Sequence, residues 1–228
     1  MSAAIIAIRP EPGLSSTIAV GKAHGLDIIG LPLSQTEPVG WELPDLTGVD
    51  ALLVGSANVF RHGGEALGEL THLPVHAVGE ATAEAARETG FQVAAIGQGG
   101  LQNLLNSADP APNHFLRLAG EERISLKPPE STAITEKVVY RVRNLPLNAT
   151  QAALFATPAM VLLHSASSAA HFAKECKRLG LDRPRISLAA LGPRILAAAG
   201  AGWAEARAAA APADSELLAL AQDMWQRH

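Results

Sequence analysis

The sequence predicts an α/β protein with two similar domains, each built on a parallel sheet. Residues 51–60 form an apolar stretch that ends in small polar residues, and a second apolar stretch at 75–78 ends at Gly79. Residues 161–168 and 187–195 repeat this order of strand, turn, helix, strand and helix. Because two copies of one module imply two similar domains, we expect two α/β domains with a cleft between them.

The bulk composition is that of a folded protein without a nucleic-acid or membrane partner. The chain has 228 residues, 48% of them hydrophobic, and a net charge of -4 from mixed signs, which argues against binding to nucleic acid. Its single cysteine, Cys176, excludes an intramolecular disulfide and fits a reducing compartment as a structural thiol. No signal-like or membrane-spanning run is present, so we expect a cytoplasmic protein, and without coiled-coil heptads we expect a monomer.

The first half of the chain reads as alternating strands and helices. The first strand, at 3–8, stops before Pro10, because proline cannot donate to a sheet. A helix at 14–24 ends near Gly25, and a strand at 27–33 runs into a polar segment at 35–38, the first expected linker. Further strands are expected at 51–54, 75–78, 91–96 and 114–118, and helices at 58–70, 80–89 and 101–107.

The second half returns the chain to the first domain. A β-rich segment at 135–142 precedes a second expected linker at 144–147, and the second module runs from about residue 160. Residues 208–211 are expected to be a loop or short strand end. The last helix is expected to start with Asp214 as its cap. The first domain should therefore comprise residues 1–34 plus 148–228, and the second domain residues 39–143.

Polar side chains and glycines follow the predicted parallel strands, where ligands of open α/β sheets bind and helix N-termini favour anions. These candidates are Arg9, Ser56, Asn58, Gly79, Thr82, Gly120, Ser165, Ser167, Gly192 and Arg194. Asn58 and Thr82 could instead cap or pack near helix starts, and the two arginines could form surface ion pairs. Tyr140, the only tyrosine, could give a proton to a ligand or simply pack with its hydroxyl at the surface.

Metal and nucleotide chemistry are not indicated. His72 and His76 have a spacing that would suit a zinc site on a helix, but Pro74 between them breaks any such helix. Neither a phosphate-binding loop nor a complete dinucleotide fingerprint follows the first strand. We therefore expect no metal site.

Taken in order, the segments resemble the uroporphyrinogen-III synthase family of tetrapyrrole biosynthesis. The matching segments are RP at 9–10, LVGSAN at 53–58, VGEATA at 78–83, LAGE at 118–121, VYR at 139–141, HSASS at 164–168 and LGP at 191–193. They span nearly the whole chain in the family's order.

The resemblance implies two flavodoxin-like domains with parallel sheets, joined by two extended linkers. It also implies a substrate, hydroxymethylbilane, whose eight carboxylates could be held by backbone amides and helix N-termini, so that Ala57 and Ala166 in the matched turns join the expected substrate-binding residues. Thr82 matches a family threonine that would contact carboxylates. No metal or organic cofactor is implied, and the enzyme that makes the unstable bilane, hydroxymethylbilane synthase, is a possible transient partner.

The implied reaction is a cyclisation with loss of water. Departure of the terminal hydroxyl gives an azafulvene, which attacks the substituted carbon of ring D; the resulting spiro intermediate fragments and recloses with ring D inverted. Tyr140 matches the family tyrosine suggested to assist departure of water.

Two departures from the family pattern concern the site. Arg194 and Ile195 stand where many relatives have threonines, and residues 124–132 lack the helix and glycine often found there. The Arg194 and Ile195 departure prompts one alternative, a family member that has lost activity. Independently of it, the two-domain architecture also fits a non-catalytic protein that binds a small molecule and would retain it unchanged.

Overall fold

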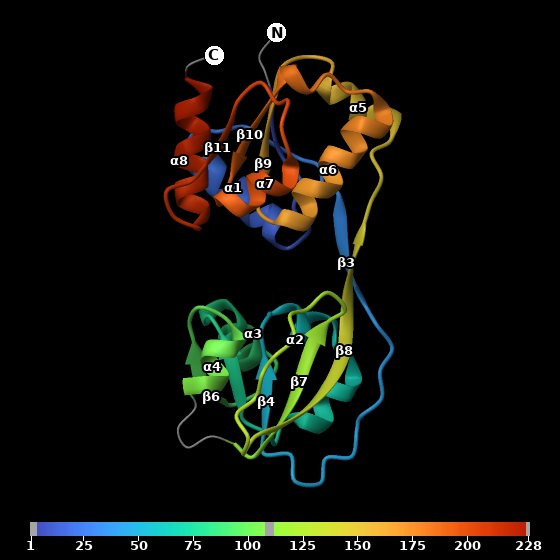
Figure 1. The fold of residues 1–228 in the computed structure, drawn as a ribbon, viewed down its shortest axis with the longest axis vertical. Helices are drawn as coiled ribbons and strands as arrows, with labels where there is room; N and C mark the ends of the chain where they lie inside the picture. Colours follow the sequence, from blue (N-terminus) through green and yellow to red (C-terminus); the bar gives the residue numbers. More distant parts are fainter. Residues whose placement is uncertain (1–3, 108–111, 227–228) are drawn as a thin grey trace. The chain divides into compact units, whose positions relative to one another are not determined.

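The chain folds into two compact α/β units (Figure 1). The structure, a computed structural model, describes residues 4–107 and 112–226. Unit 1 comprises Met1–Gln35 and Arg143–His228, and unit 2 comprises Thr36–Val142. The chain passes between the units within β3 (Ser34–Pro38) and near the end of β8 (Ala133–Asn144). The segment at 35–38, expected to be a linker, is therefore part of a strand.

Unit 1 is built on a five-stranded parallel sheet. Its order is β11-β10-β9-β1-β2, and Ile6 of β1 lies opposite both Val161 and Ile29. The strands are β1 (Ala4–Ala7), β2 (Ile28–Gly30), β9 (Ala159–Leu163), β10 (Ile186–Ala190) and β11 (Ala206–Ala208). Every residue of β9 and β10 is buried, which explains their unbroken apolar sequences: a parallel sheet covered on both faces has no polar side.

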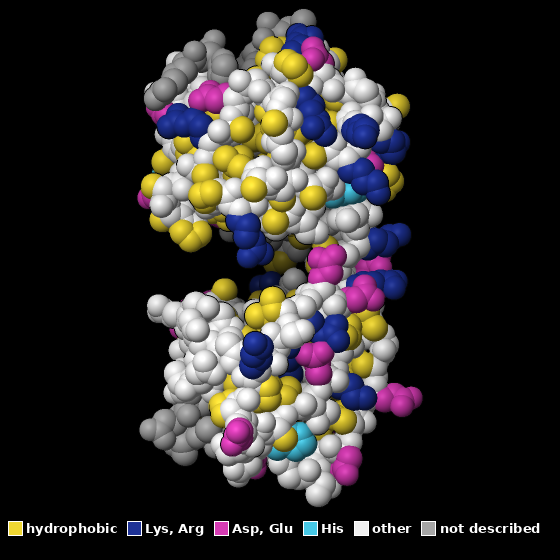
Figure 2. Space-filling model, viewed as in Figure 1, with side chains coloured by type: hydrophobic (Ala, Val, Ile, Leu, Met, Phe, Trp, Pro, Cys, Tyr) yellow, Lys and Arg dark blue, Asp and Glu magenta, His cyan; other side chains and the backbone are white. Residues whose placement is uncertain are grey.

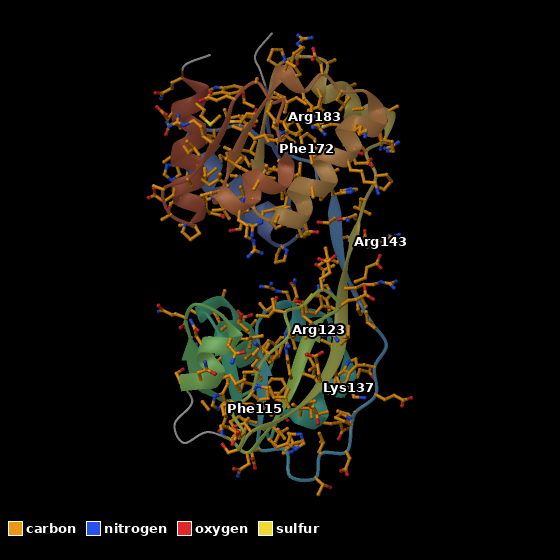
Figure 3. The ribbon with its side chains drawn as sticks, in the orientation of Figure 1. Phe115, Arg123, Lys137, Arg143, Phe172 and Arg183 are labelled. Atoms are coloured by element: carbon orange, nitrogen blue, oxygen red, sulfur yellow. The ribbon has the colours of Figure 1, made fainter. Side chains whose placement is uncertain are left out.

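Helices cover both faces of this sheet. One hydrophobic cluster joins it to α6 (Ala166–Leu179), α7 (Pro193–Ala199) and the 3-10 helix η2 (Ala153–Phe155), and the other joins it to α1 (Gly13–Ala23) and α8 (Asp214–Trp225). Phe172 of α6, labelled in Figure 3, stacks on Trp203 with ring centroids 5.7 Å apart. Two short helical segments, α5 (Ala149–Ala152) and η3 (Arg183–Arg185), lie in the connections.

Cys176 lies in the first of these clusters. Its side chain is buried, and burial raises the pKa of the thiol to about 12. A thiol held in its protonated form is a poor nucleophile, which fits the structural role expected for it.

Unit 2 is built on a six-stranded sheet of order β3-β8-β7-β4-β5-β6. Its further strands are β4 (Ala51–Val54), β5 (Val75–Val78), β6 (Val93–Gly97) and β7 (His114–Gly120). The pairs β4–β5, β4–β7, β5–β6 and β7–β8 are parallel. The sheet therefore reverses its direction of growth between β4 and β7, because the chain first adds β5 and β6 on one side and then β7 and β8 on the other.

The two faces of this sheet are covered differently. One face packs on α2 (Asn58–His62), the 3-10 helix η1 (Glu65–Leu70) and α3 (Glu80–Glu88). The other packs on α4 (Leu101–Ser107) and on Leu126 from the connection between β7 and β8.

The single helix expected at 58–70 is wrong. The chain leaves α2 at Gly63 and re-enters helical geometry only after Gly64, whose φ of +70° lies in the left-handed region that favours glycine. The sequence carries this signal as the Gly-Gly pair.

No helix in residues 4–107 and 112–226 is both long and apolar enough to cross a membrane. On the face of unit 2 that Figure 2 shows, basic and acidic side chains are interspersed.

Candidate functional site

Each sheet has one position where ligands of open α/β folds bind, namely the carboxyl ends of the two strands at which the strand order reverses. In unit 2 these strands are β4 and β7, and in unit 1 they are β1 and β9. Ser56 and Gly120 follow or end the first pair, and Arg9 and His164 follow the second pair. The turns selected from the sequence therefore include the reversal point of both sheets.

A pocket lies at the reversal point of unit 2. Its volume is about 240 Å³, and its lining includes Gly55, Ser56, Arg117, Gly120, Arg123 and Tyr140. We call it the Tyr140 pocket. The Tyr140 hydroxyl makes no hydrogen bond or ion pair with any described residue, so it can donate to a ligand. The structure thus brings three of the expected site residues, Ser56, Gly120 and Tyr140, together.

A register shift places Tyr140 in this pocket. Ala119 of β7 lies opposite Val138 of β8, but the next residue, Gly120, lies opposite Tyr140. Val139 is the extra residue, and such irregularities re-aim side chains near sites. A Cβ added at Gly120 would lie 2.7 Å from the Tyr140 ring, so glycine is needed where the ring crosses the end of β7.

The turn after β4 is held by Ser56, whose Oγ accepts from the backbone N–H of Asn58 at 3.2 Å. Asn58 is the first residue of α2, and the N-cap position is occupied by Ala57, so Asn58 is not the cap considered from the sequence. Ala57 is buried beside it. Of these three residues, only Ser56 lines the Tyr140 pocket.

Gly79 and Thr82 lie at the start of α3, after β5. Gly79 has a φ of +76°, which favours glycine, and Thr82 is buried in the first turn, where its side chain makes no cap hydrogen bond. Neither lines the Tyr140 pocket. The expected contact of Thr82 with a carboxylate therefore stays a prediction.

At the reversal point of unit 1, four polar side chains form a connected cluster. Arg9 Nη1 donates to Asp214 Oδ2 at 2.9 Å and to Thr17 Oγ1 at 3.1 Å. Thr17 Oγ1 also donates to Asp214 Oδ2 at 3.0 Å. His164 Nε2 lies 3.5 Å from Thr17 Oγ1 and 3.5 Å from Asp214 Oδ1. Arg9 thus forms the ion pair that the sequence left open.

Asp214 is not the helix cap that was expected. Ala213 occupies the N-cap of α8 without a side-chain hydrogen bond, and the Asp214 carboxylate turns to Arg9 and Thr17 instead. These partners are far away in sequence, so no local pattern indicates them.

The pKa of His164, the histidine of this cluster, is strongly lowered. Its side chain is 5% exposed, and burial, together with the positive charge of Arg9, lowers its pKa to about 4 although Asp214 opposes the shift. The imidazole is therefore neutral at pH 7 and adds no charge beside Arg9.

The remaining expected residues of unit 1 follow β9 and β10. Ser165 caps α6 by accepting from the backbone N–H of Ser168 at 3.1 Å, while Ala166 and Ser167 begin that helix. Gly192 is the N-cap of α7. Arg194, in the first turn of α7, is exposed and makes no hydrogen bond or ion pair with any described residue, so the surface ion pair considered for it does not form there.

Sequence reasoning missed Arg117 and its partner Glu136. Arg117 sits inside the apolar strand β7, is 3% exposed, and its Nη1 lies 2.8 Å from Glu136 Oε2 on the neighbouring strand. Arg123 contacts the same carboxylate. A charged residue inside a buried strand was the available signal, but finding its partner requires the β7–β8 register.

Among the residues that the structure describes, no group of three or more His, Cys, Asp or Glu side chains is placed to hold a metal ion. His76 lies on β5, buried against Phe115 with ring centroids 5.0 Å apart in an edge-on arrangement.

Comparison with known proteins decides the family. The family model described as uroporphyrinogen-III synthase HemD matches residues 15–219. The chain belongs to the uroporphyrinogen-III synthase family. Among curated proteins, no sequence matches significantly.

Solved structures of uroporphyrinogen-III synthases share the fold. The enzyme from Helicobacter pylori is 18% identical, with 97% of this chain and 99% of that chain covered and a TM-score of 0.67. A mutant synthase from the extremely thermophilic bacterium Thermus thermophilus is 17% identical, with 99% and 100% covered and a TM-score of 0.53. At these identities the structural likeness carries the two-unit α/β architecture and nothing about individual side chains.

Proposed function

We propose that this chain is an active uroporphyrinogen-III synthase, a lyase that cyclises hydroxymethylbilane with inversion of ring D and loss of water. Membership of the family supports the reaction class. The observation that carries the site is the meeting of Tyr140 with Ser56 and Gly120 in one pocket at the reversal point of a parallel sheet.

Tyr140 acts at the leaving hydroxyl in this proposal. The phenol donates a hydrogen bond or proton to that oxygen, which leaves as water while the terminal pyrrole becomes the azafulvene. The phenol proton is restored after ring closure, when the macrocycle loses its excess proton. Two features support this role: the hydroxyl has no partner among the described residues, and the ring is fixed against Gly120.

Substrate carboxylates are bound by backbone and side-chain donors of both units. In unit 2 these are the turns that contain Ser56, Ala57, Asn58, Gly79, Thr82 and Gly120. In unit 1 they are Arg9 and Arg194 with the turns that contain Ser165, Ala166, Ser167 and Gly192. Oriented N–H groups at helix starts favour anions, which supports binding of a polyanion by a chain with a net charge of -4.

The finer expectations about the protein in the cell belong to this proposal. We propose a cytoplasmic monomer that contacts hydroxymethylbilane synthase transiently and needs no cofactor. Light scattering tests the monomer: a mass near the chain's 23.7 kDa is expected, and twice that mass would contradict it.

The proposed function is tested by a coupled assay that generates hydroxymethylbilane in place, oxidises the products and separates the type I and type III uroporphyrin isomers. Predominant type III is expected. Type I alone from folded protein would reject the enzyme and favour the inactive family member or the non-catalytic binding protein, which would retain its ligand unchanged.

A further inference from the structure

A second pocket in unit 2 shares three lining residues with the Tyr140 pocket, namely Arg117, Arg123 and Ile124. Its volume is about 570 Å³, within the range typical of small-molecule sites. Its other lining residues include Ser125, Leu126, Ile134 and Glu136. We call it the arginine pocket.

The wall of the arginine pocket is a fixed structure although residues 123–129 have no regular secondary structure. Gln102 of α4 donates its side-chain N–H to the carbonyl of Lys127 at 2.8 Å and accepts from the Lys127 N–H at 2.8 Å. Arg117 Nη1 donates to the carbonyl of Ile124 at 2.9 Å. The segment is therefore held at two points, at Ile124 and at Lys127.

Arg117 has unused hydrogen-bonding capacity at this pocket. Its Nη1 bonds to Ile124 and Glu136, its Nε is buried without a partner, and its Nη2 bonds to no described residue. Nε and Nη2 form one edge of the planar guanidinium, an edge that donates two parallel hydrogen bonds to a carboxylate. A buried guanidinium with unpaired donors is costly, so the edge favours an anion.

The charges around this edge also favour an anion. Arg117 and Arg123 share one carboxylate, that of Glu136, so the residues lining the arginine pocket carry one positive charge in excess (Figure 3 labels Arg123). Glu122 lines the Tyr140 pocket but not this one. Leu126 and Ile134 add apolar surface beside the arginines.

We propose that the arginine pocket binds an acid-bearing pyrrole ring of the tetrapyrrole, whose carboxylate accepts from Arg117 and Arg123 while the apolar side chains cover the methylene groups. This inference rests on the proposed function and names two specificity-determining residues for it. Nε is buried, so Nη2, which bonds to no described residue, is the Arg117 donor that the carboxylate engages.

The first test removes one positive charge from the pocket and leaves the buried Arg117 unchanged. Arg123→Gln keeps a polar side chain at a 33% exposed site, and Arg141→Gln, which changes a 51% exposed, ion-paired arginine on β8, is the matched control. Each protein is titrated with uroporphyrin III, the oxidised product, by fluorescence. Loss of a charge-assisted contact should weaken binding about three- to tenfold in Arg123→Gln and leave Arg141→Gln within about twofold of wild type.

The second test fills the pocket and leaves both arginines in place. Ser125→Trp introduces a large side chain into the lining, and Ser131→Trp changes an exposed serine of the same connection that does not line the pocket. Binding should weaken in Ser125→Trp and be retained in Ser131→Trp.

The outcomes separate this inference from the proposed function. If wild type forms type III isomer but Arg123→Gln and Ser125→Trp bind uroporphyrin as wild type does, the arginine pocket is rejected and the synthase stands. If wild type neither forms type III nor binds uroporphyrin, both are rejected together.

Discussion

At the scale of single residues, the site depends on how one aromatic ring is held. Tyr140 lies across the end of β7 because Gly120 has no side chain there, and its hydroxyl has no partner among the described residues. Ring placement and proton donation are therefore separate properties, and different substitutions test them.

Tyr140→Phe removes the hydroxyl and keeps the ring. The rate of type III formation should fall at least about tenfold, because a positioned general acid contributes a factor of about 10² or more. The remaining rate enhancement comes from holding the substrate in its folded geometry, which this variant leaves unchanged. The coupled isomer assay measures this. Unchanged rates in a folded variant would remove Tyr140 from the chemistry.

Gly120→Ala keeps the hydroxyl and moves the ring. The added methyl group would meet the Tyr140 ring at 2.7 Å, so we expect a loss of synthase rate of about tenfold or more, because small misplacements at a reacting group are costly. Gly68→Ala, where a new Cβ meets nothing within 4 Å, is the control and should retain activity. Equal rates in the two variants would contradict the proposed placement of Tyr140.

His164 should make the protein sensitive to acid. Its pKa falls from an ordinary 6.5 to about 4 on folding, so between these values the unfolded chain binds a proton that the folded chain lacks. The free energy of unfolding should then decrease as pH falls through this window, by up to about 3 kcal/mol from this group.

Urea unfolding at pH 7.5 and pH 5 checks this. His164→Gln should lose less stability between the two values than wild type, whereas exposed His24→Gln should behave like wild type. If His164→Gln loses as much stability as wild type between pH 7.5 and pH 5, burial does not lower the pKa of His164 in the folded protein.

At the scale of elements, α6 holds the chain where it re-enters unit 1. His171 Nε2 donates to the carbonyl of Leu145 at 2.7 Å, and Arg178 Nη2 donates to the carbonyl of Leu147 at 2.7 Å. Glu175, 4% exposed, accepts from the Leu147 N–H at 2.8 Å and pairs with Arg178. Three side chains of one helix thus satisfy the backbone of the segment after β8.

Glu175→Ala should destabilise the protein by about 1–3 kcal/mol, because it leaves the buried Leu147 N–H without its acceptor. Denaturant unfolding measures the change. Lys174→Ala, an exposed neighbour on the same helix, should stay within about 0.5 kcal/mol of wild type. A similar small effect for both would show that α6 does not hold this segment.

The Glu175 carboxylate also makes stability depend on pH, and stability decreases as pH falls. The hydrogen bonds from Arg178 lower the pKa of Glu175, so its contribution to stability is present above the unfolded value of 4.5 and is lost as pH falls below it. Glu175→Ala should therefore also reduce the loss of stability at the acid end.

At the scale of the whole molecule, the sequence predicted the α/β class, because apolar strands followed by small polar turns and helices occur twice. It predicted that Arg9, Ser56 and Gly120 belong to strand ends, and the structure places them at the reversal points of the two sheets. Period and turn chemistry are local properties, so one sequence carries them.

Features that depend on distant partners could not be predicted in this way. Arg117 and Glu136 become a pair through the β7–β8 register, and the side chain of Asp214, the first residue of α8, pairs with Arg9 after β1. The register shift that turns Tyr140 toward Gly120 is likewise a property of two strands together. The break after α2 could have been predicted, because the adjacent glycines Gly63 and Gly64 indicate it in the local sequence.

The measurement that tests the account most directly is the isomer composition formed from hydroxymethylbilane as wild-type protein is added in increasing amounts. An active synthase predicts that the type III fraction rises with protein until type III predominates over the type I product of spontaneous closure. A product that stays type I at every protein concentration, with the protein folded, would contradict the account.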